Sequence, residues 1–232
     1  DVGVRVELPA PVFEPLTDKL YESKLIYHSP TFGDEVRTFC MNPNGEVVQE
    51  NYNGISTVNG HSYAEKTTNN TNFALLVSEK FTEPFKEPIQ YGQHIARLAN
   101  MLGGGILVQR FGDLLDGRRS TPERIKSSII KPTLTCATPG DLSLVIPYRQ
   151  MTSIIEMLQA LDKVCPGTAS RYTLLYGIEV KFYSARVKLT DKLETEGVKN
   201  LFAIGDGAGV TRGLIQASAS GVHVARTICA RG

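Results

Sequence analysis

The sequence predicts a mixed α/β chain in which an α+β unit is followed by the strand, turn and helix of a Rossmann-like nucleotide-binding fold. Residues 2–8 alternate in character with the period of a strand. An apolar run at 201–204 leads through Gly-Asp-Gly into a segment rich in Ala, Ser and Gly. We therefore expect three parts: a strand at 1–8 that returns from another unit, an α+β domain at 9–186, and a C-terminal nucleotide-binding segment at 187–232.

The first half of the α+β domain is predicted to consist mainly of strands. Proline at positions 9, 11 and 15 interrupts the backbone, so we expect residues 9–20 to form a linker. Asn-Pro-Asn-Gly at 42–45 has the chemistry of a tight turn and predicts a hairpin between the strands on either side of it. The β-rich runs that we interpret as strands are 24–28, 36–41, 46–49 and 73–77.

Two longer helices are predicted further along the chain. Apolar residues recur at helical spacing over 88–102, between Pro88 and a triple glycine that ends the pattern. A second apolar stripe covers 151–164 and ends at Pro-Gly. The shorter predicted elements are a strand at 106–108, a helix after a Ser120–Glu123 capping box, a strand at 133–137 and a β-rich stretch at 174–189.

Composition narrows the classes of partner. The chain has 232 residues, of which 41% are hydrophobic and 21% charged, and its net charge is +1 with no long run of one sign. Nothing in this pattern indicates nucleic acid or an anionic membrane surface as a partner, and no stretch reaches the ~20 apolar residues of a membrane span. Four scattered cysteines without metal-site spacing favour free thiols in a reducing compartment, so we expect a cytoplasmic protein without a metal site.

The C-terminal segment has the chemistry of a ligand site. A strand ending in Gly205-Asp206 places the carboxylate at the carboxyl edge of a sheet, where open α/β folds bind ligands. An ionised Asp206 accepts hydrogen bonds from hydroxyl groups, and Gly205 and Gly207 let a ligand come close. The helix that follows directs the free N–H groups of Gly213, Leu214 and Ile215 toward the same region, which favours an anion there.

Residues 200–209, Asn-Leu-Phe-Ala-Ile-Gly-Asp-Gly-Ala-Gly, resemble the C-terminal flavin motif of FAD-dependent oxidoreductases with a two-part dinucleotide fold. Residues 37–47, 59–62 and 72–76 resemble the middle and C-terminal part of bacterial FAD-dependent dehydrogenases. The resemblance implies that 9–186 is an inserted substrate-side domain and that 1–8 is a returning strand of the FAD domain.

For chemistry, the resemblance implies hydride or electron transfer through FAD to or from a small-molecule substrate, with NAD(P)H as a possible reductant. It assigns cofactor binding to the C-terminal turn and helix start: Gly205, Asp206, Gly207, Thr211, Gly213, Leu214 and Ile215.

The sequence departs from this family plan because it has no GxGxxG motif after a strand. The glycines at 103–105 follow a helix, and those at 205–209 lack the final spacing. We therefore expect the chain to be the C-terminal part of a larger flavoprotein whose N-terminal FAD-binding half is its partner. Alone, it is predicted to bind FAD weakly or not at all and to be inactive.

The sequence assigns substrate-binding residues less clearly than cofactor-binding residues, and it does not identify the catalytic residues. Cys40 is either a redox thiol or a structural cysteine in a strand. His61 is either a proton donor or an exposed loop histidine. Arg118-Arg119, with Lys126 and Lys131, either recognises an anionic substrate or nicotinamide phosphate or forms a solvated surface.

Two other functions are compatible with the sequence. The middle domain could be a non-catalytic substrate-recognition or interaction module of a flavin-binding protein. The chain could also belong to a nucleotide-binding transferase, although the phosphate-binding glycine loop that such an enzyme needs is absent from this sequence.

Overall fold

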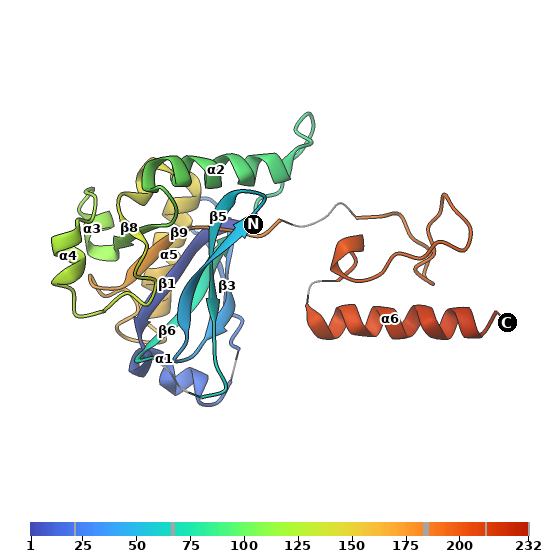
Figure 1. The fold of residues 1–232 in the computed structure, drawn as a ribbon, viewed down its shortest axis with the longest axis horizontal. Coiled ribbons are helices and arrows are strands. Elements are labelled where there is room, and N and C mark those ends of the chain that lie inside the picture. Colours follow the sequence, from blue (N-terminus) through green and yellow to red (C-terminus); the bar gives the residue numbers. More distant parts are fainter. Residues whose placement is uncertain (21, 66–67, 183–185, 212, 232) are drawn as a thin grey trace. The chain divides into compact units, whose positions relative to one another are not determined.

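The computed structural model describes residues 1–20, 22–65, 68–182, 186–211 and 213–231. The chain divides into two compact units, Asp1–Lys181 and Phe182–Gly232 (Figure 1). Mixed α and β elements fill the first unit, as predicted. In chain order they are β1 (Val2–Pro9), α1 (Ala10–Thr17), β2 (Ile26–His28), β3 (Glu35–Asn42), β4 (Glu46–Tyr52), β5 (Ile55–His61), β6 (Asn70–Val77), α2 (Pro88–Gly103), β7 (Leu107–Arg110), α3 (Phe111–Leu115), α4 (Pro122–Lys126), β8 (Thr138–Pro139), the 3₁₀ turn η1 (Leu142–Leu144), α5 (Tyr148–Asp162) and β9 (Leu174–Val180).

A seven-stranded sheet with the order β2-β3-β6-β1-β9-β7-β8 forms the framework of the first unit. β1 lies at its centre, antiparallel to both β6 and β9, and β7–β8 is the parallel pair. This pairing differs from the prediction that residues 1–8 return to an FAD domain, because β1 forms its ladder with strands of the first unit on both edges. Alternation in a sequence reveals a strand, but it does not reveal that strand's neighbours.

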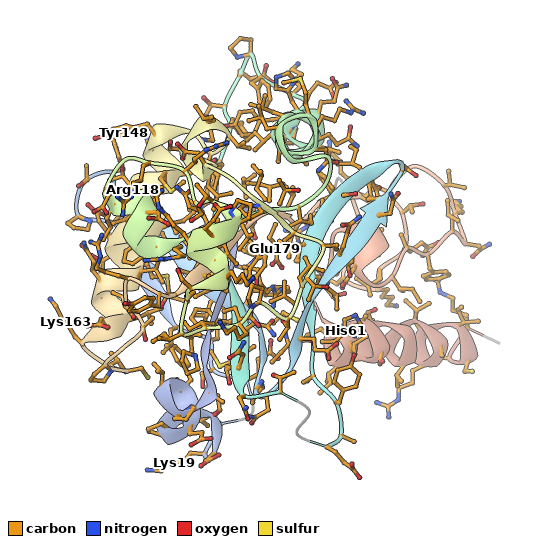
Figure 2. The ribbon with its side chains drawn as sticks, turned by 60° about the vertical axis from the view of Figure 1, so that its left-hand side comes forward. Lys19, His61, Arg118, Tyr148, Lys163 and Glu179 are labelled. Carbon is orange, nitrogen blue, oxygen red and sulfur yellow. The ribbon has the colours of Figure 1, made fainter. Side chains whose placement is uncertain are left out.

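One face of the sheet is apolar and is covered by helices. The even-numbered residues of β1, from Val2 to Leu8, lie on this face together with Phe73 and Leu75 of β6. Phe13 of α1 packs its ring 4.7 Å from that of Phe73. Figure 2 shows α5, between the labelled Tyr148 and Lys163, on one side of the sheet, and the strand that ends at His61 on the other.

The other face is covered by the β4–β5 hairpin, whose strands pair from Glu46↔His61 to Tyr52↔Ile55. Asn53 and Gly54 make its turn with positive φ angles of 50° and 79°, as a two-residue Asn-Gly turn requires. The hairpin predicted around residues 42–45 is wrong. That turn exists, but the chain there passes from one sheet to another, and β3 pairs with β6 while β4 pairs with β5.

Three further predictions for the first unit are wrong. Residues 9–20 contain helix α1 rather than a linker, because buried Phe13 stabilises a short helix despite its prolines. Residues 133–137 form bends and a turn rather than a strand. The predicted Ser120–Glu123 capping box is not formed, because the N-cap of α4 is Thr121, whose Oγ1 accepts from the Arg124 N–H at 3.3 Å. The Ser120 hydroxyl donates to Asp113 instead.

The second unit contains η2 (Asp206–Ala208) and α6 (Leu214–Cys229). The strand predicted at 201–204 is not formed among the described residues, where Phe202 makes an isolated bridge to Glu194. Leu201 and Ile204 are 50% and 45% exposed, so this apolar run lacks the neighbouring strands that would make it part of a sheet. The parallel, Rossmann-like sheet predicted for this segment is therefore not seen in the part of the chain that the structure describes.

None of the helices formed by the described residues combines the length and the apolar character that crossing a membrane requires.

Candidate functional site

The Gly205–Ala208 turn is fixed to helix α6 by hydrogen bonds. The Gly205 N–H donates to Ser220 Oγ at 3.0 Å, and that hydroxyl donates to the Ala217 carbonyl at 2.7 Å. Gly205 has a φ of +71°, which glycine adopts without strain. The turn therefore has a defined position against the helix, although the strand expected before it is not formed.

Asp206 connects the turn to the start of α6. Its carboxylate accepts from the Thr211 hydroxyl at 2.6 Å and from the Gly213 N–H at 3.4 Å. The structure thus brings together three of the seven predicted cofactor-binding residues in one hydrogen-bonded loop. A carboxylate is also the preferred group at this end of a helix, where the unpaired N–H groups create a partial positive charge.

The start of α6 is open. Gly213, with a φ of +136°, is the N-cap residue and has no side chain that could cap the helix. Leu214 and Ile215 are 89% and 80% exposed, and a Cβ on Gly207 would meet no atom within 4 Å. All seven predicted residues consequently lie in one short stretch that offers a carboxylate acceptor, helix N–H donors and exposed apolar side chains.

The second unit also has a hollow of about 450 Å³, which does not coincide with this stretch. Residues 186–191 line much of it, including Arg186 and Lys188, and Val210 is the lining residue nearest in sequence to the predicted site. The hollow borders the Asp206 loop, because its lining residue Val187 donates its N–H to the Ala208 carbonyl at 3.1 Å, but none of the seven predicted residues lines it.

The first unit has a buried polar layer between its large sheet and the β4–β5 hairpin, which the sequence did not predict. Arg5 is fully buried and forms a two-point ion pair with Glu179, at 2.8 Å from Nε and 2.7 Å from Nη2. Its other donors reach Asn59 Oδ1 at 2.9 Å and Asn72 Oδ1 at 3.1 Å. A Cβ on Gly60 would clash with Arg5, so the hairpin backbone lies directly on this layer.

Cys40 lies at the edge of the polar layer. It has a positive φ of 46° at the irregularity where the β3–β6 register shifts, and its carbonyl accepts from Arg5 Nη1 at 2.8 Å. Its thiol is half-buried and is 3.8 Å from Asn42 Nδ2. No base accompanies this thiol among the contacts of the described residues.

His61, the other weak catalytic candidate, is the exposed last residue of β5. Its backbone pairs with Glu46, and no hydrogen bond to its ring is found among the described residues. The structure therefore does not join Cys40 and His61 into a nucleophile and base.

A second carboxylate, Glu7, lies on the same face of β1 as Arg5. It accepts from Tyr176 Oη at 2.5 Å, Thr133 Oγ1 at 2.6 Å and Asn70 Nδ2 at 3.0 Å. Burial raises the pKa of Glu7, and these hydrogen bonds oppose part of that rise. The pKa of Tyr176 is raised well above its usual value, mainly by burial and to a smaller extent by the charge of Glu7.

A sequence signal for this layer does exist. Residues 73–77, Phe-Ala-Leu-Leu-Val, are continuously apolar, which indicates a strand buried on both faces. The sequence does not show which strand lies beside it, so the burial of Arg5 and Glu7 follows only from the pairing of β1 with β6. No group of His, Cys, Asp and Glu side chains suited to a metal ion occurs in the described part of the chain.

Comparison with known proteins identifies two similarities. The family model described as "FAD-dependent protein, C-terminal domain-like" matches residues 2–182. An uncharacterized protein of Clostridium beijerinckii (strain ATCC 51743 / NCIMB 8052) is 32% identical over 248 residues, an alignment that covers 98% of this chain and 45% of that protein. The chain thus spans less than half the length of this relative.

Proposed function

The chain belongs to the FAD-dependent protein, C-terminal domain-like family, and from this premise we propose that it is the C-terminal part of an FAD-dependent oxidoreductase. In this proposal the first unit is the substrate-side domain for a small molecule. The second unit completes the flavin site of an N-terminal FAD-binding half.

The single observation that best supports this assignment is the Asp206 loop. Its carboxylate is fixed beside the start of α6 by Thr211 and Gly213, and the N-cap residue Gly213 has no side chain that could cap the helix. This donor and acceptor set fits a flavin, whose ribityl chain has hydroxyl groups and whose pyrimidine edge accepts hydrogen bonds. The open space around Gly207 also fits the close approach of a ligand.

Each predicted residue then has a distinct role. Asp206 would accept hydrogen bonds from ribityl hydroxyls, and the N–H groups of Leu214 and Ile215 would stabilise negative charge on the cofactor. Gly205, Gly207 and Gly213 would give the backbone its path without side chains in the way, and Thr211 would orient the carboxylate. Bound flavin supplies the hydride or electron transfer, with NAD(P)H as the proposed reductant.

The test replaces Asp206 with Ala in the full-length protein that contains this chain. We expect FAD to bind about tenfold more weakly, because a hydrogen bond to a charged group is lost. Flavin absorbance after dialysis measures retention, and Asp191→Ala, which removes an exposed carboxylate of the same unit, serves as the control. Equal flavin retention in both variants would refute the role of Asp206. In this proposal the 232-residue chain alone binds FAD weakly, and fluorescence titration with FAD measures that affinity.

A non-catalytic recognition module is the second candidate function. It is favoured by the first unit, in which Cys40 and His61 have no catalytic partner among the described residues and the strongly hydrogen-bonded polar groups are enclosed. Addition of NADH or NADPH to the full-length protein separates the two functions. Bleaching of the flavin absorbance supports the oxidoreductase, whereas stable absorbance with both reductants supports the module. Cytoplasmic location and the absence of a nucleic-acid or membrane partner stay predictions.

A further inference from the structure

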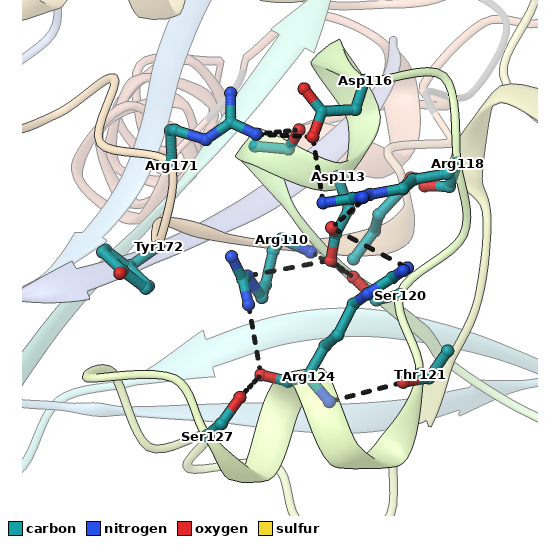
Figure 3. Close-up of polar contacts among 12 residues, drawn as sticks. Arg110, Asp113, Asp116, Arg118, Ser120, Thr121, Arg124, Ser127, Arg171 and Tyr172 are labelled. Atoms are coloured by element: carbon teal, nitrogen blue, oxygen red, sulfur yellow. Dashed lines mark hydrogen bonds and ion pairs between the residues drawn. The ribbon is translucent and has the colours of Figure 1, made fainter.

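Four arginines gather around two aspartates at the end of β7 and the short helices α3 and α4 (Figure 3). Asp113 is fully buried, and three guanidinium groups approach its carboxylate: Arg118 at 3.0 Å, Arg110 at 3.7 Å and Arg124 at 4.0 Å. We call this group, together with Asp116 and Arg171, the arginine cluster. Asp116 accepts from Arg171 at 2.5 Å and pairs with Arg118 at 3.0 Å.

The charges within the arginine cluster do not balance. Four arginines carry four positive charges that cannot titrate in the ordinary pH range, and two aspartates carry two negative charges. Neighbouring Arg119 and Glu123 add one charge of each sign. Because three guanidinium groups lie within 4.0 Å of one carboxylate, they are close to one another, and their repulsion is only partly offset. An additional anion would offset the remainder.

The guanidinium groups are also held in place before any ligand arrives. Arg110 lies over the ring of Tyr172 at 5.1 Å, and Arg124 Nη1 donates to the Arg119 carbonyl at 2.8 Å. Ser120 Oγ donates to Asp113 at 2.8 Å, which fixes the carboxylate that orients the cluster. Groups fixed in advance lose little conformational entropy when they bind a ligand.

Donor capacity remains after these contacts. The buried Nε of Arg110 has no hydrogen-bond partner among the described residues. The side chains of Arg118, Arg124 and Arg171 are 47%, 36% and 54% exposed, so three of the four arginines are accessible to a ligand from solvent. Guanidinium forks match the geometry of phosphate and carboxylate oxygens.

We propose that the arginine cluster binds a small polyvalent oxyanion, such as the phosphate group of a soluble metabolite. The four arginines supply the hydrogen-bond donors, and Asp113 and Asp116 act as positioning residues that hold the guanidinium groups in place through ion pairs. Of the two interpretations of Arg118-Arg119, the pairing of Arg118 with Asp113 and Asp116 favours anion recognition over a merely solvated surface. The proposal is independent of the flavin assignment, which concerns the other unit.

The experiment is calorimetric titration of the 232-residue chain with inorganic pyrophosphate at constant ionic strength. Saturable binding of one pyrophosphate per chain is expected. Arg124→Gln and Arg171→Gln should each weaken binding about tenfold, because each removes a charge-assisted hydrogen bond. Neither residue is a partner of the buried polar layer, and circular dichroism verifies that both variants are folded.

Arg97→Gln is the matched control, since it removes one positive charge from the exposed surface of α2 and should change the affinity less than twofold. Asp206→Ala, measured in the same titration, should leave pyrophosphate binding unchanged and so separates this site from the flavin site. The proposal would be overturned by the absence of saturable binding, or by equal weakening in Arg97→Gln and Arg124→Gln. Binding to vesicles that contain phosphatidylglycerol without binding to pyrophosphate would also overturn it.

Discussion

The two units of the chain differ in how completely they bury their side chains. The first unit encloses even charged residues, with Arg5, Glu7 and Glu179 fully buried and hydrogen-bonded. The second unit leaves large apolar residues in solvent, with Leu214 and Ile215 at 89% and 80% exposure. The first unit thus has a complete core of its own, whereas the second offers apolar surface suited to contact with another chain segment or a ligand.

The largest test of this comparison breaks the buried ion pair. Arg5→Leu should lower the free energy of unfolding of the first unit by about 3–5 kcal/mol, because buried Glu179 loses its two-point ion pair and two asparagines each lose a hydrogen bond. Urea unfolding followed by circular dichroism measures this change.

Glu83→Gln is the control for the ion-pair test, since Glu83 and Lys86 form an exposed pair with side chains 77% and 71% accessible. It should change stability by less than about 0.5 kcal/mol. The double variant Arg5→Met/Glu179→Leu should recover part of the loss, because neither member of the buried Arg5–Glu179 pair is then left without the other. Recovery should be incomplete, because Lys181 loses its 3.0 Å contact with Glu179. Equal effects of Arg5→Leu and Glu83→Gln would contradict the account of the polar layer.

A matched pair of valine truncations compares the two cores directly. Val4 and Val224 are 0% and 6% exposed, but Val4 lies inside a large sheet and Val224 lies on a helix with few buried neighbours. Val4→Ala should cost about 2 kcal/mol and Val224→Ala less than about 1 kcal/mol. Hydrogen exchange of the β1 and α6 amides reports each unit separately. A larger loss in α6 than in β1 would reverse the comparison.

The smallest expected effect is a pH dependence from Glu7. Its pKa in the folded protein is raised from the ordinary value of 4.5, so the folded state retains this proton more strongly than the unfolded state. Ionisation of Glu7 therefore lowers the free energy of unfolding as the pH rises from below 4.5 to above the pKa of Glu7 in the folded protein. Glu7→Gln removes that cost, so the stability of the variant relative to the natural protein should rise across this range. Urea unfolding at several pH values measures the difference, and a constant difference would show that burial of Glu7 has no titratable consequence.

The sequence was sufficient for elements whose stability depends on one clear local pattern. Helices α2 and α5 were predicted from their apolar spacing and their proline and glycine boundaries, and the structure confirms both. Strands β3 and β6 were predicted within a few residues, and β9 was predicted at its first residue, but the predicted stretch extended to 189 whereas the strand ends at Val180. The FAD-dependent family was predicted from residue motifs and is confirmed by the family match over residues 2–182.

The sequence was insufficient where distant partners decide the structure. The turn at 42–45 was predicted, but its two strands enter different sheets. Helix α1 depends on the contact of Phe13 with Phe73, 60 positions away. The residues of the Asp206 loop were predicted from the sequence. A strand at 201–204 would need neighbouring strands to pair with, and Phe202 makes only an isolated bridge to Glu194. The arginine cluster depends on Asp113, which gave no distinctive sequence pattern.

The central position of β1 has a consequence for how the protein is made. β1 forms its ladder with β6 and with β9, so its second partner emerges from the ribosome roughly 100 residues after its first. At typical synthesis rates this is a delay of about 5–20 s, during which one edge of the first strand has no native neighbour. Pairings between such distant segments fold slowly and expose strand edges to aggregation. The nascent chain is accordingly expected to depend on chaperones until residue 180 has left the ribosome.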